Sequence, residues 1–405
     1  MLLAAATTEV VLGALVVIPM LIYRIKAKRW QRINLEYPEE SHETELMILL
    51  PIWNEGLVIE KKLADLNRDY SFKTSLLVID SASSDDSVEK VKQWLSDNKS
   101  VFFTSQVIEM PERLGKTAAV KQAIESLDRQ SYTGLVLMTD ADAFIDEGTI
   151  ERLHGWFVDP SIGAVGSRAI RQTKLHGEKH YRSLYHFLRV AESKRDSTPF
   201  LEGSCMMWRH GTFRSVDLNV DSNADDAQIA TLIRIAGLRS ILDANAAFTD
   251  FAPTTIEGQR RQKIRRAQGL QNLLHRFPKQ HILPKDGDFS RIFRAQRHFH
   301  LVVPIMLFQI AIVTIIRWIY VSITGMPTGF EAGLHASLAF VELLILVSWL
   351  TYRTGIRLPL VTTIGALVTS FEYLFIASYR NSSGQSSHVW NQHSDVRKQM
   401  HEFSN

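Results

Sequence analysis

The sequence is poor in cysteine, and this absence excludes two kinds of stabilising site. Cys205 is the single cysteine among 405 residues. The chain can therefore form no internal disulfide and cannot hold a cysteine-rich metal centre. Any bound metal should have oxygen ligands.

A strong excess of charge of one sign is also missing. The 46 Lys and Arg residues and the 43 Asp and Glu residues leave a net charge of 46 − 43 = +3. Because so small a bias gives little attraction to a polyanion, we expect no nucleic acid among the partners.

Long apolar runs, by contrast, are present near both ends of the chain. Residues 10–23 form such a run, and the basic segment RIKAKRWQR follows at once. A signal peptide would carry its positive charge before the apolar stretch. This order therefore favours an uncleaved membrane anchor, formed by residues 1–30. The basic flank predicts that the N-terminus lies outside and that the following domain is cytoplasmic.

Three more apolar segments occur late in the sequence, at residues 301–321, 334–351 and 358–379. Their near-spanning length favours membrane helices over buried core helices, and we expect about three spans within 301–380. The chain should thus be an integral membrane protein of the plasma membrane, with lipid as a partner. Three spans would place the polar tail, 381–405, outside, unless one of the segments lies in the membrane interface.

Residues 45–255 alternate between strand and helix patterns. Apolar runs predict strands near 45–53, 75–80, 101–110 and 134–139, and helical spacing predicts helices near 55–68, 87–97 and 115–128, the second capped by Ser87. Such alternation is typical of an α/β fold, with a mostly parallel sheet covered by helices on both faces.

Polar residues follow these predicted strands. They are Asn54, Glu55, Asp80, Asp140 and Asp142. Ligands of open parallel sheets bind beyond the carboxyl ends of the strands, so these positions are candidates for a binding site. Any one of them alone could instead be a helix cap or part of a solvated loop.

Two of these acids stand one residue apart at the end of an apolar strand. Asp140 and Asp142 would repel each other unless a positive group is bound. Mg²⁺ or Mn²⁺ takes oxygen ligands and leaves positions for substrate phosphates, so the pair suits a metal that binds a diphosphate.

Seven motifs occur in an order that resembles an inverting family 2 glycosyltransferase of the GT-A fold. The resemblance is to the membrane-embedded kind that includes cellulose, chitin and hyaluronan synthases, and it covers about residues 45–270. The motifs are LPIWNE, VIDSASSDDS, GKTAAVKQA, TDADA, FLEGSCMMWRHG, NADDAQIATLIRIAG and QKIRRAQG.

The resemblance implies a nucleotide diphosphate sugar as donor, bound in part by residues of the first two strand ends. Asp80 matches the residue that binds the base or ribose, and Asn54 and Glu55 lie in the matching loop. Lys116 matches a position near the donor, where it could also neutralise phosphate, although a solvated lysine at a helix start is the alternative. Asp140 and Asp142 match the motif that binds Mg²⁺ or Mn²⁺ and the diphosphate.

A second acid pair, Asp225 and Asp226, matches the pair whose second member is the general base. A carboxylate beside another acid can have its pKa raised toward a useful value, so we expect Asp226 to deprotonate the acceptor. The same residues could instead cap the following helix. The family usually has Thr-Glu-Asp here, whereas this chain has Ala224 before the pair.

Gln262, Arg265 and Arg266 match the Gln-x-x-Arg-Trp motif of the family. The resemblance implies that the glutamine and first arginine bind diphosphate, but Arg266 replaces the tryptophan that stacks on the acceptor sugar. This replacement weakens the case for a processive polysaccharide synthase. The surrounding 256–300 segment is also basic and amphipathic and could lie on anionic lipid, and both roles are compatible.

The segment with Gly203, Ser204 and Cys205 matches the floor of the acceptor site. We expect Cys205 to pack there rather than to act as a nucleophile. The sequence thus predicts transfer of a sugar to a lipid-linked or glycan acceptor. A polyprenyl phosphate glycosyltransferase is the first alternative, and a catalytically inactive sugar-nucleotide-binding assembly module is the second.

Overall fold

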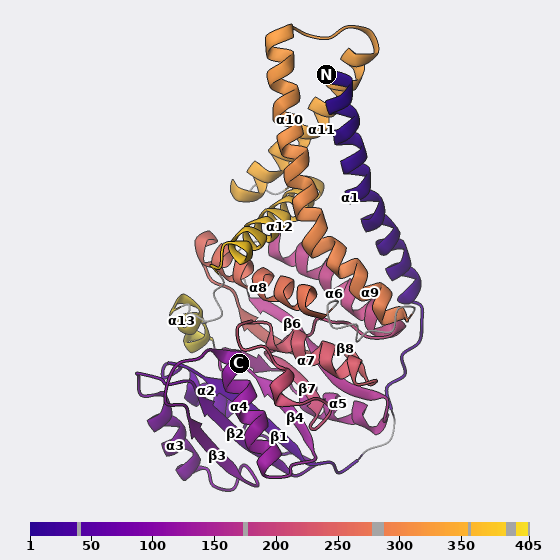
Figure 1. The fold of residues 1–405 in the computed structure, drawn as a ribbon. Helices are drawn as coiled ribbons and strands as arrows, with labels where there is room; N and C mark the ends of the chain where they lie inside the picture. Colours follow the sequence, from indigo (N-terminus) through magenta and orange to yellow (C-terminus); the bar gives the residue numbers. More distant parts are fainter. Residues whose placement is uncertain (39–41, 173–176, 278–286, 355–357, 386–393, 404–405) are drawn as a thin grey trace.

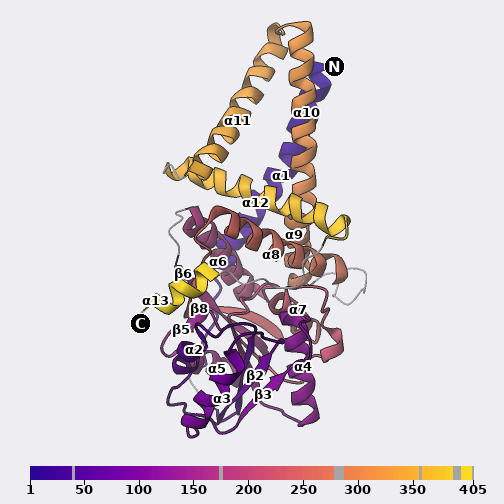
Figure 2. The same ribbon diagram turned by 90° about the vertical axis from the view of Figure 1, so that its left-hand side faces the viewer.

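The computed structural model joins an α/β domain to a narrower column of apolar helices (Figure 1). It describes residues 1–38, 42–172, 177–277, 287–354, 358–385 and 394–403. The N-terminus lies at the far end of the column, and the C-terminal helix lies against the α/β domain (Figures 1 and 2).

The α/β domain is built on one mixed sheet, in the order β3-β2-β1-β4-β7-β6-β8-β5. Its strands are β1 (Leu46–Ile52), β2 (Thr74–Asp80), β3 (Ser105–Glu109), β4 (Leu135–Thr139), β5 (Ala143–Ile145), β6 (Ile162–Gln172), β7 (Cys205–Arg209) and β8 (Arg239–Phe251). β1 to β4 pair in parallel, as do β6 and β8, while β7 is antiparallel to both β4 and β6. The predicted α/β class with a mostly parallel sheet is confirmed.

Helices cover both faces of this sheet. Those of the α/β domain are α2 (Ile59–Asp65), α3 (Ser87–Asp97), α4 (Lys116–Arg129), α5 (Thr149–Gly155), α6 (Gly177–Arg195) and α7 (Asp225–Ile235). Alternate side chains of β1 enter different cores: Leu49 packs with residues of α4 and α7, and Ile48 packs with residues of α2, α3 and α5. Burial on both faces explains why this strand is apolar throughout.

Three details of the sequence prediction are wrong. The third strand begins at Ser105, not near residue 101, and α2 spans Ile59–Asp65, which is shorter than expected. Ser87 does not cap α3, because Asp86 occupies the cap position. The Ser87 hydroxyl instead accepts a 2.7 Å hydrogen bond from the backbone N–H of Glu55, and so joins two loops at the sheet edge.

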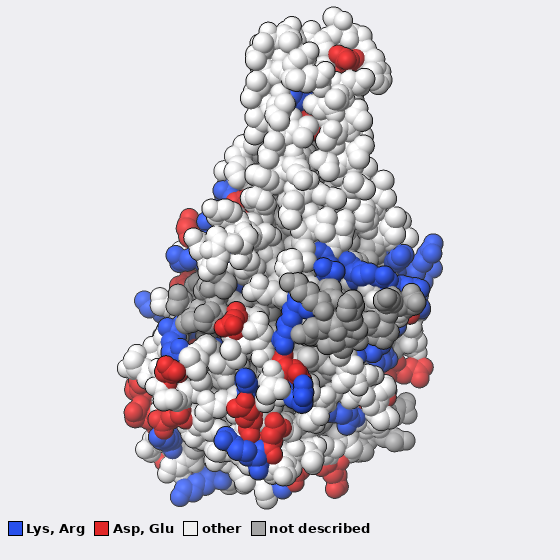
Figure 3. All heavy atoms as spheres, viewed as in Figure 1, with Lys and Arg blue, Asp and Glu red and all other residues white. Residues whose placement is uncertain are grey.

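The remaining helices form the column and its base. They are α1 (Leu2–Trp30), α8 (Ile256–Arg276), α9 (Asp288–Arg297), α10 (Val303–Thr324), α11 (Gly329–Thr354), α12 (Pro359–Ser382) and α13 (Ser394–Glu402). Four helical segments among the described residues are long and apolar enough to cross a membrane, ending at Trp30, Thr324, Thr354 and Ser382. Their surface is almost free of charge, and Lys and Arg gather where the column meets the α/β domain (Figure 3).

A buried charged cluster joins α1, α10 and α11 within the column. Arg317 is fully buried, and its Nε donates a 2.8 Å hydrogen bond to Glu9. It also pairs with Glu342, which accepts a 2.8 Å bond from the indole of Trp318. A charge in so apolar a setting needs partners, so this cluster fixes three helices relative to one another.

α12 differs in direction from the other apolar helices. α1, α10 and α11 run along the column, whereas α12 lies across its base and over α8 (Figure 2). The Gln271 amide of α8 donates 2.9 Å hydrogen bonds to the carbonyl of Leu374 and to the hydroxyl of Ser378 in α12. This arrangement fits the alternative in which one apolar segment is interfacial, and it leaves α13 on the same side as the α/β domain.

Candidate active site

A cavity opens where the carboxyl end of β4 meets the N-terminal ends of α4 and α7. We call it the acidic cavity, because Asp140, Asp142, Asp225 and Asp226 all line it. Lys116 lines it as well. Residues from three distant parts of the sequence thus line one cavity.

Lys116 forms the positive centre of this cavity. Its Nζ lies 2.6 Å from Oδ1 of Asp140 and 3.4 Å from Oδ2 of Asp225. Burial disfavours the charge of the lysine, but the two carboxylates outweigh that effect and hold its pKa above the ordinary value. In turn, burial would raise the pKa of Asp140, but Lys116 outweighs it and lowers that pKa. A solvated lysine is therefore excluded here.

Asp225 and Asp226 begin α7 but do not cap it. The cap position belongs to Ala224, and no side chain makes a capping hydrogen bond. Oδ2 of Asp226 accepts a 3.0 Å hydrogen bond from the N–H of Gly203, and Oδ1 accepts one of 2.7 Å from the N–H of Ala227. These bonds orient the carboxylate toward the cavity.

The pKa of Asp226 is raised to about 7. Burial is the largest cause, and the neighbouring charge of Asp225 is the second. A carboxylate with a pKa near neutrality can take a proton from a substrate at physiological pH, which is the property that a general base requires.

Asp142 has a partner that sequence reasoning did not find. Nη1 of Arg397, in α13, lies 2.8 Å from Oδ2 of Asp142, and the same guanidinium pairs with the fully buried Glu55. α13 is held there by Val396 and Met400, which pack into an apolar cluster of the α/β domain. The tail sequence around Arg397 carries no motif, so nothing in it indicated this contact.

Asp140 and Asp142 have the chemistry expected of a divalent metal site. The described residues contain no group of three or more His, Cys, Asp or Glu side chains that could hold a metal alone. Two carboxylates on one cavity nevertheless fit Mg²⁺ or Mn²⁺, because these ions commonly complete their shell with phosphate oxygens and water. Lys116 pairs with Asp140, and Arg397 pairs with Asp142.

Residues of α8 form the opposite wall of the acidic cavity. Gln262, Arg265 and Arg266 all line it. Burial, followed by the nearby charge of Arg266, lowers the pKa of Arg265 to about 10, and its Nε has no hydrogen-bond partner within the described structure. A half-buried guanidinium that lies near carboxylates and has an unpartnered, buried Nε is suited to an anionic ligand.

The segment that precedes β7 forms part of the floor. Gly203 and Ser204 line the cavity, and the Ser204 hydroxyl donates a 2.8 Å hydrogen bond to Asp140. A Cβ on Gly203 would lie 3.2 Å from Nζ of Lys116, so glycine permits this close approach. The assignment of Cys205 to the acceptor floor is wrong. Its side chain is fully buried in the core and lines neither the acidic cavity nor the adjoining cavity described below. Burial raises the pKa of its thiol to about 11.

Three predicted donor residues lie at the same sheet edge but do not line the acidic cavity. Asp80 accepts a 2.9 Å hydrogen bond from the N–H of Ser83, and the N–H of Asn54 donates to the hydroxyl of Ser83 at 2.8 Å. Glu55 is buried against Arg397. Asn54 and Asp80 therefore shape a loop beside the cavity, and Glu55 orients α13.

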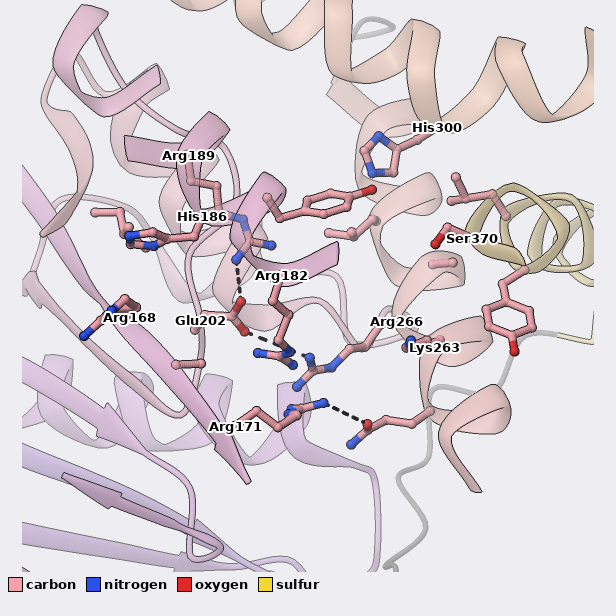
Figure 4. A pocket seen from close by; sticks show the side chains of 18 of the residues that line it. Arg168, Arg171, Arg182, His186, Arg189, Glu202, Lys263, Arg266, His300 and Ser370 are labelled. Atoms are coloured by element: carbon pink, nitrogen blue, oxygen red, sulfur yellow. Dashed lines mark hydrogen bonds and ion pairs between the residues drawn. The ribbon is translucent and has the colours of Figure 1, made fainter. Parts of the chain in front are cut away.

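A second cavity adjoins the first, and all of the arginines that line it except Arg266 lie outside the sequence motifs. We call it the basic cavity (Figure 4). Its basic lining residues are Arg168, Arg171, Arg182, Arg189, Lys263 and Arg266. Glu202, Arg171, Arg189, Gln262 and Arg266 line both cavities and form the boundary between them. The motif match indicated Arg266, and the basic amphipathic character of 256–300 pointed to Lys263 as well.

Two family profiles match the chain. The one described as Glycosyl transferase family 2 matches residues 47–216, and the one described as Glycosyl transferase family group 2 matches residues 135–368. The second alone covers more than half of the chain. Together the two profiles extend from β1 to α12.

Curated relatives and a solved structure agree with these profiles. Poly-beta-1,6-N-acetyl-D-glucosamine synthases from several strains of Staphylococcus aureus are 22% identical over 283 residues, which is 68% of this chain and 63% of theirs. The mannosyltransferase PcManGT from Pyrobaculum calidifontis, solved in complex with GDP-Man and Mn²⁺, is 26% identical with a TM-score of 0.72. That alignment covers 94% of this chain and 99% of the other, so the likeness includes the apolar helices.

Proposed function

The chain belongs to family group 2 of the glycosyl transferases, and from this premise we propose that it moves a sugar from a nucleotide diphosphate sugar to a membrane-bound acceptor with inversion. Its α/β domain has the GT-A fold, and the enzyme is a glycosyltransferase. The observation that carries the proposal is the raised pKa of Asp226 beside Lys116, Asp140 and Arg265 in one cavity.

The donor diphosphate would lie over Lys116 and Arg265. Lys116 is the first residue of α4, so the backbone N–H groups of that helix end add to its positive charge. Arg265 approaches from α8 on the opposite wall. Charges fixed before the reaction stabilise the leaving diphosphate most strongly, because they need no reorganisation.

Asp226 would act as the general base. As the acceptor oxygen attacks the anomeric carbon, its proton passes to the Asp226 carboxylate and the bond between the sugar and the diphosphate breaks. The nucleotide diphosphate leaves with the electron pair of that bond. The hydrogen bonds from Gly203 and Ala227 hold the carboxylate in place for this transfer.

Asp140 and Asp142 would hold Mg²⁺ or Mn²⁺ together with diphosphate oxygens. When bound, such an ion would supply further neutralisation of the leaving group. Support comes from the oxygen chemistry of the two side chains and from the Mn²⁺ in the similar mannosyltransferase structure.

We place the α/β domain on the cytoplasmic side of the plasma membrane. Lys and Arg gather at the base of the column (Figure 3), and such residues accumulate on the cytoplasmic side of membrane proteins. A nucleotide sugar would be available on that side. The N-terminus, at the far end of α1, would then lie outside.

A donor screen on the full chain in lipid nanodiscs tests this function. GDP-mannose is the first donor to try, because the mannosyltransferase with the similar fold was solved with it. Radiolabelled GDP- and UDP-sugars should each be supplied with Mn²⁺ or Mg²⁺ and membrane lipid extract. We expect transfer or slow hydrolysis of one donor in the wild type and none in Asp226→Asn. If the wild type binds nucleotide but turns over no donor, the protein is a binding module instead.

The replacement of the acceptor-stacking tryptophan by Arg266 favours a second candidate. In a polyprenyl phosphate glycosyltransferase the acceptor is itself a phosphate, which needs neither a stacking aromatic ring nor strong base catalysis. The exposed Arg266 lies near Glu202 at the boundary of the basic cavity. Sizing the labelled product separates polymer, short glycolipid and polyprenyl phosphate sugar.

A further inference from the structure

The charged side chains that line the basic cavity are predominantly positive. Its lining includes five arginines and Lys263 but, within the described structure, one acid, Glu202. Figure 4 shows the guanidinium groups of Arg171, Arg182 and Arg266 directed toward one another beside Glu202. Like charges that converge in a partly enclosed space are stabilised by an anion.

The pKa values of two nearby carboxyl groups are lowered by this positive charge. Burial would raise the pKa of Glu202, but Arg189, Arg266 and Arg182 outweigh it and hold that pKa well below its usual range. Asp250, which pairs with Arg171, has a lowered pKa for a similar reason. His186 also lines the cavity. Burial, followed by the charges of Arg168 and Arg189, lowers its pKa to about 4, so the imidazole is neutral at pH 7.

The basic cavity lies between the apolar helix α12 and the acidic cavity. Ser370, Tyr373 and Leu374 of α12 line one side, and α12 is the apolar helix that lies across the base of the column (Figure 2). Glu202 and Arg266 form the boundary with the acidic cavity on the other side. A ligand in the basic cavity would therefore touch both the apolar layer and the neighbourhood of Asp226.

We propose that the basic cavity binds the phosphate or diphosphate group of a lipid-linked acceptor. The apolar tail lies along α12, the phosphate is held by Arg182, Lys263 and Arg266, and the group to be glycosylated reaches Asp226. Arginine forks and a lysine suit phosphate oxygens, and an anion here would relieve the repulsion between the guanidinium groups. This inference rests on the proposed function, because it names the acceptor class for the same reaction.

A binding measurement tests the proposal without requiring turnover. Full-length protein in phosphatidylcholine nanodiscs is titrated with geranylgeranyl diphosphate in EDTA, which weakens diphosphate binding at the metal-dependent donor site. Geranylgeraniol serves as the uncharged lipid, and inorganic diphosphate as the anion without a tail. The variants are Arg182→Ala, Lys263→Ala and the charge-keeping Arg182→Lys. Arg261→Ala is the matched control, because it removes the same charge from an exposed position of α8 outside both cavities.

We expect saturable binding of geranylgeranyl diphosphate and none of geranylgeraniol. Loss of one charge-assisted hydrogen-bonding group should weaken binding about tenfold in Arg182→Ala and Lys263→Ala, with partial recovery in Arg182→Lys and no change in Arg261→Ala. Binding of a nucleotide donor with Mn²⁺ should persist in every variant, which shows that each one is folded.

Two results would overturn the proposal. Equal affinity for inorganic and geranylgeranyl diphosphate would mean that the cavity binds a soluble anion rather than a lipid. Unchanged lipid binding in both Arg182→Ala and Lys263→Ala would mean that these two side chains do not hold the headgroup. Either result is compatible with normal donor turnover by the wild type. If the proposed function itself is wrong, the wild type shows no turnover, but it can still bind lipid in EDTA.

Discussion

Arg397 donates a 2.8 Å hydrogen bond from Nη1 to Oδ2 of Asp142, although 255 residues separate the two in the sequence. The guanidinium also pairs with Glu55, and Asp142 and Glu55 together outweigh burial and raise the pKa of Arg397. The last described helix of the chain thus reaches the acid that the family motif assigns to the metal.

A divalent cation and Arg397 would compete for the same carboxylate. We therefore expect Arg397→Ala to reach half-maximal turnover at a lower Mn²⁺ concentration than the wild type. A Mn²⁺ titration at saturating donor measures this. Lys398→Ala, at the neighbouring position of α13, is the control. An increased Mn²⁺ requirement in Arg397→Ala would show instead that the arginine positions Asp142 for the metal.

Removal of Lys116 should weaken donor binding. Without its charge, Asp140 and Asp225 face the donor diphosphate directly, so we expect Lys116→Ala to raise the Kd of the donor about tenfold or more. Calorimetric titration of the donor with Mn²⁺ gives this Kd. Lys121→Ala changes the same helix outside the cavity and should bind as the wild type does. Equal affinities for both variants would exclude Lys116 from the donor site.

The raised pKa of Asp226 predicts how turnover depends on pH. The base is active only when ionised, so kcat/KM should rise with pH through about 7 and level off above it. Asp225→Asn removes a charge that raises this pKa, so the rise should move to lower pH. A profile between pH 5.5 and 8.5, spanning roughly the range of perturbed carboxylates, shows the shift. Coincident profiles for both enzymes would contradict the assignment.

The same pKa has a consequence for stability. The folded state keeps the Asp226 proton to a higher pH than the unfolded chain does, so it binds more protons between the unfolded pKa, about 4, and about 7. The contribution of this proton to the free energy of unfolding is complete below the unfolded-state pKa of Asp226. It is lost as the pH rises through the folded-state pKa. Thermal unfolding should therefore show that Asp226→Asn gains stability relative to the wild type at pH 8 but not at pH 4.

Arg317 should be essential to the packing of the column. Arg317→Leu would leave Glu9 and Glu342 without their cation, and breaking a buried ion pair costs about 3 kcal/mol or more in soluble proteins. We expect a clear fall in melting temperature in detergent, partly reversed by adding Glu9→Gln and Glu342→Gln. Arg353→Leu breaks a more exposed pair with Glu372 and should have a much smaller effect. Equal effects would mean that burial of Arg317 contributes little.

Local patterns in the sequence predicted the sheet, the acid pair of Asp140 and Asp142, and the four apolar helices. They could do so because strand alternation, Asp140 with Asp142, and the long apolar runs each occupy a short stretch of chain. Asp225 and Asp226 could be assigned to the same site as Asp140 and Asp142 only through the family resemblance, because folding alone brings α7 beside β4. The assignment of Cys205 to the acceptor failed because Cys205 begins β7 and its side chain is fully buried in the core, whereas Gly203 and Ser204 precede the strand and line the cavity.

What could not be predicted depends on contacts between distant segments. Arg397 stands in a polar tail, and its role follows only from the docking of α13. The basic cavity combines arginines from β6, α6 and α8 that share no motif. The crosswise direction of α12 depends on its packing against α8, whereas hydropathy records only length and apolarity.

The measurement closest to the central claim compares Asp226→Asn with the wild type in single-turnover transfer and in donor binding. The account predicts an unchanged donor Kd with Mn²⁺ and loss of transfer by about a hundredfold or more, because a positioned base contributes a factor of this order. The asparagine side chain has the size of aspartate and keeps one acceptor oxygen for the N–H of Gly203 or Ala227, so the fold of the site should persist. Transfer at the wild-type rate by the purified variant would show that Asp226 is not the base.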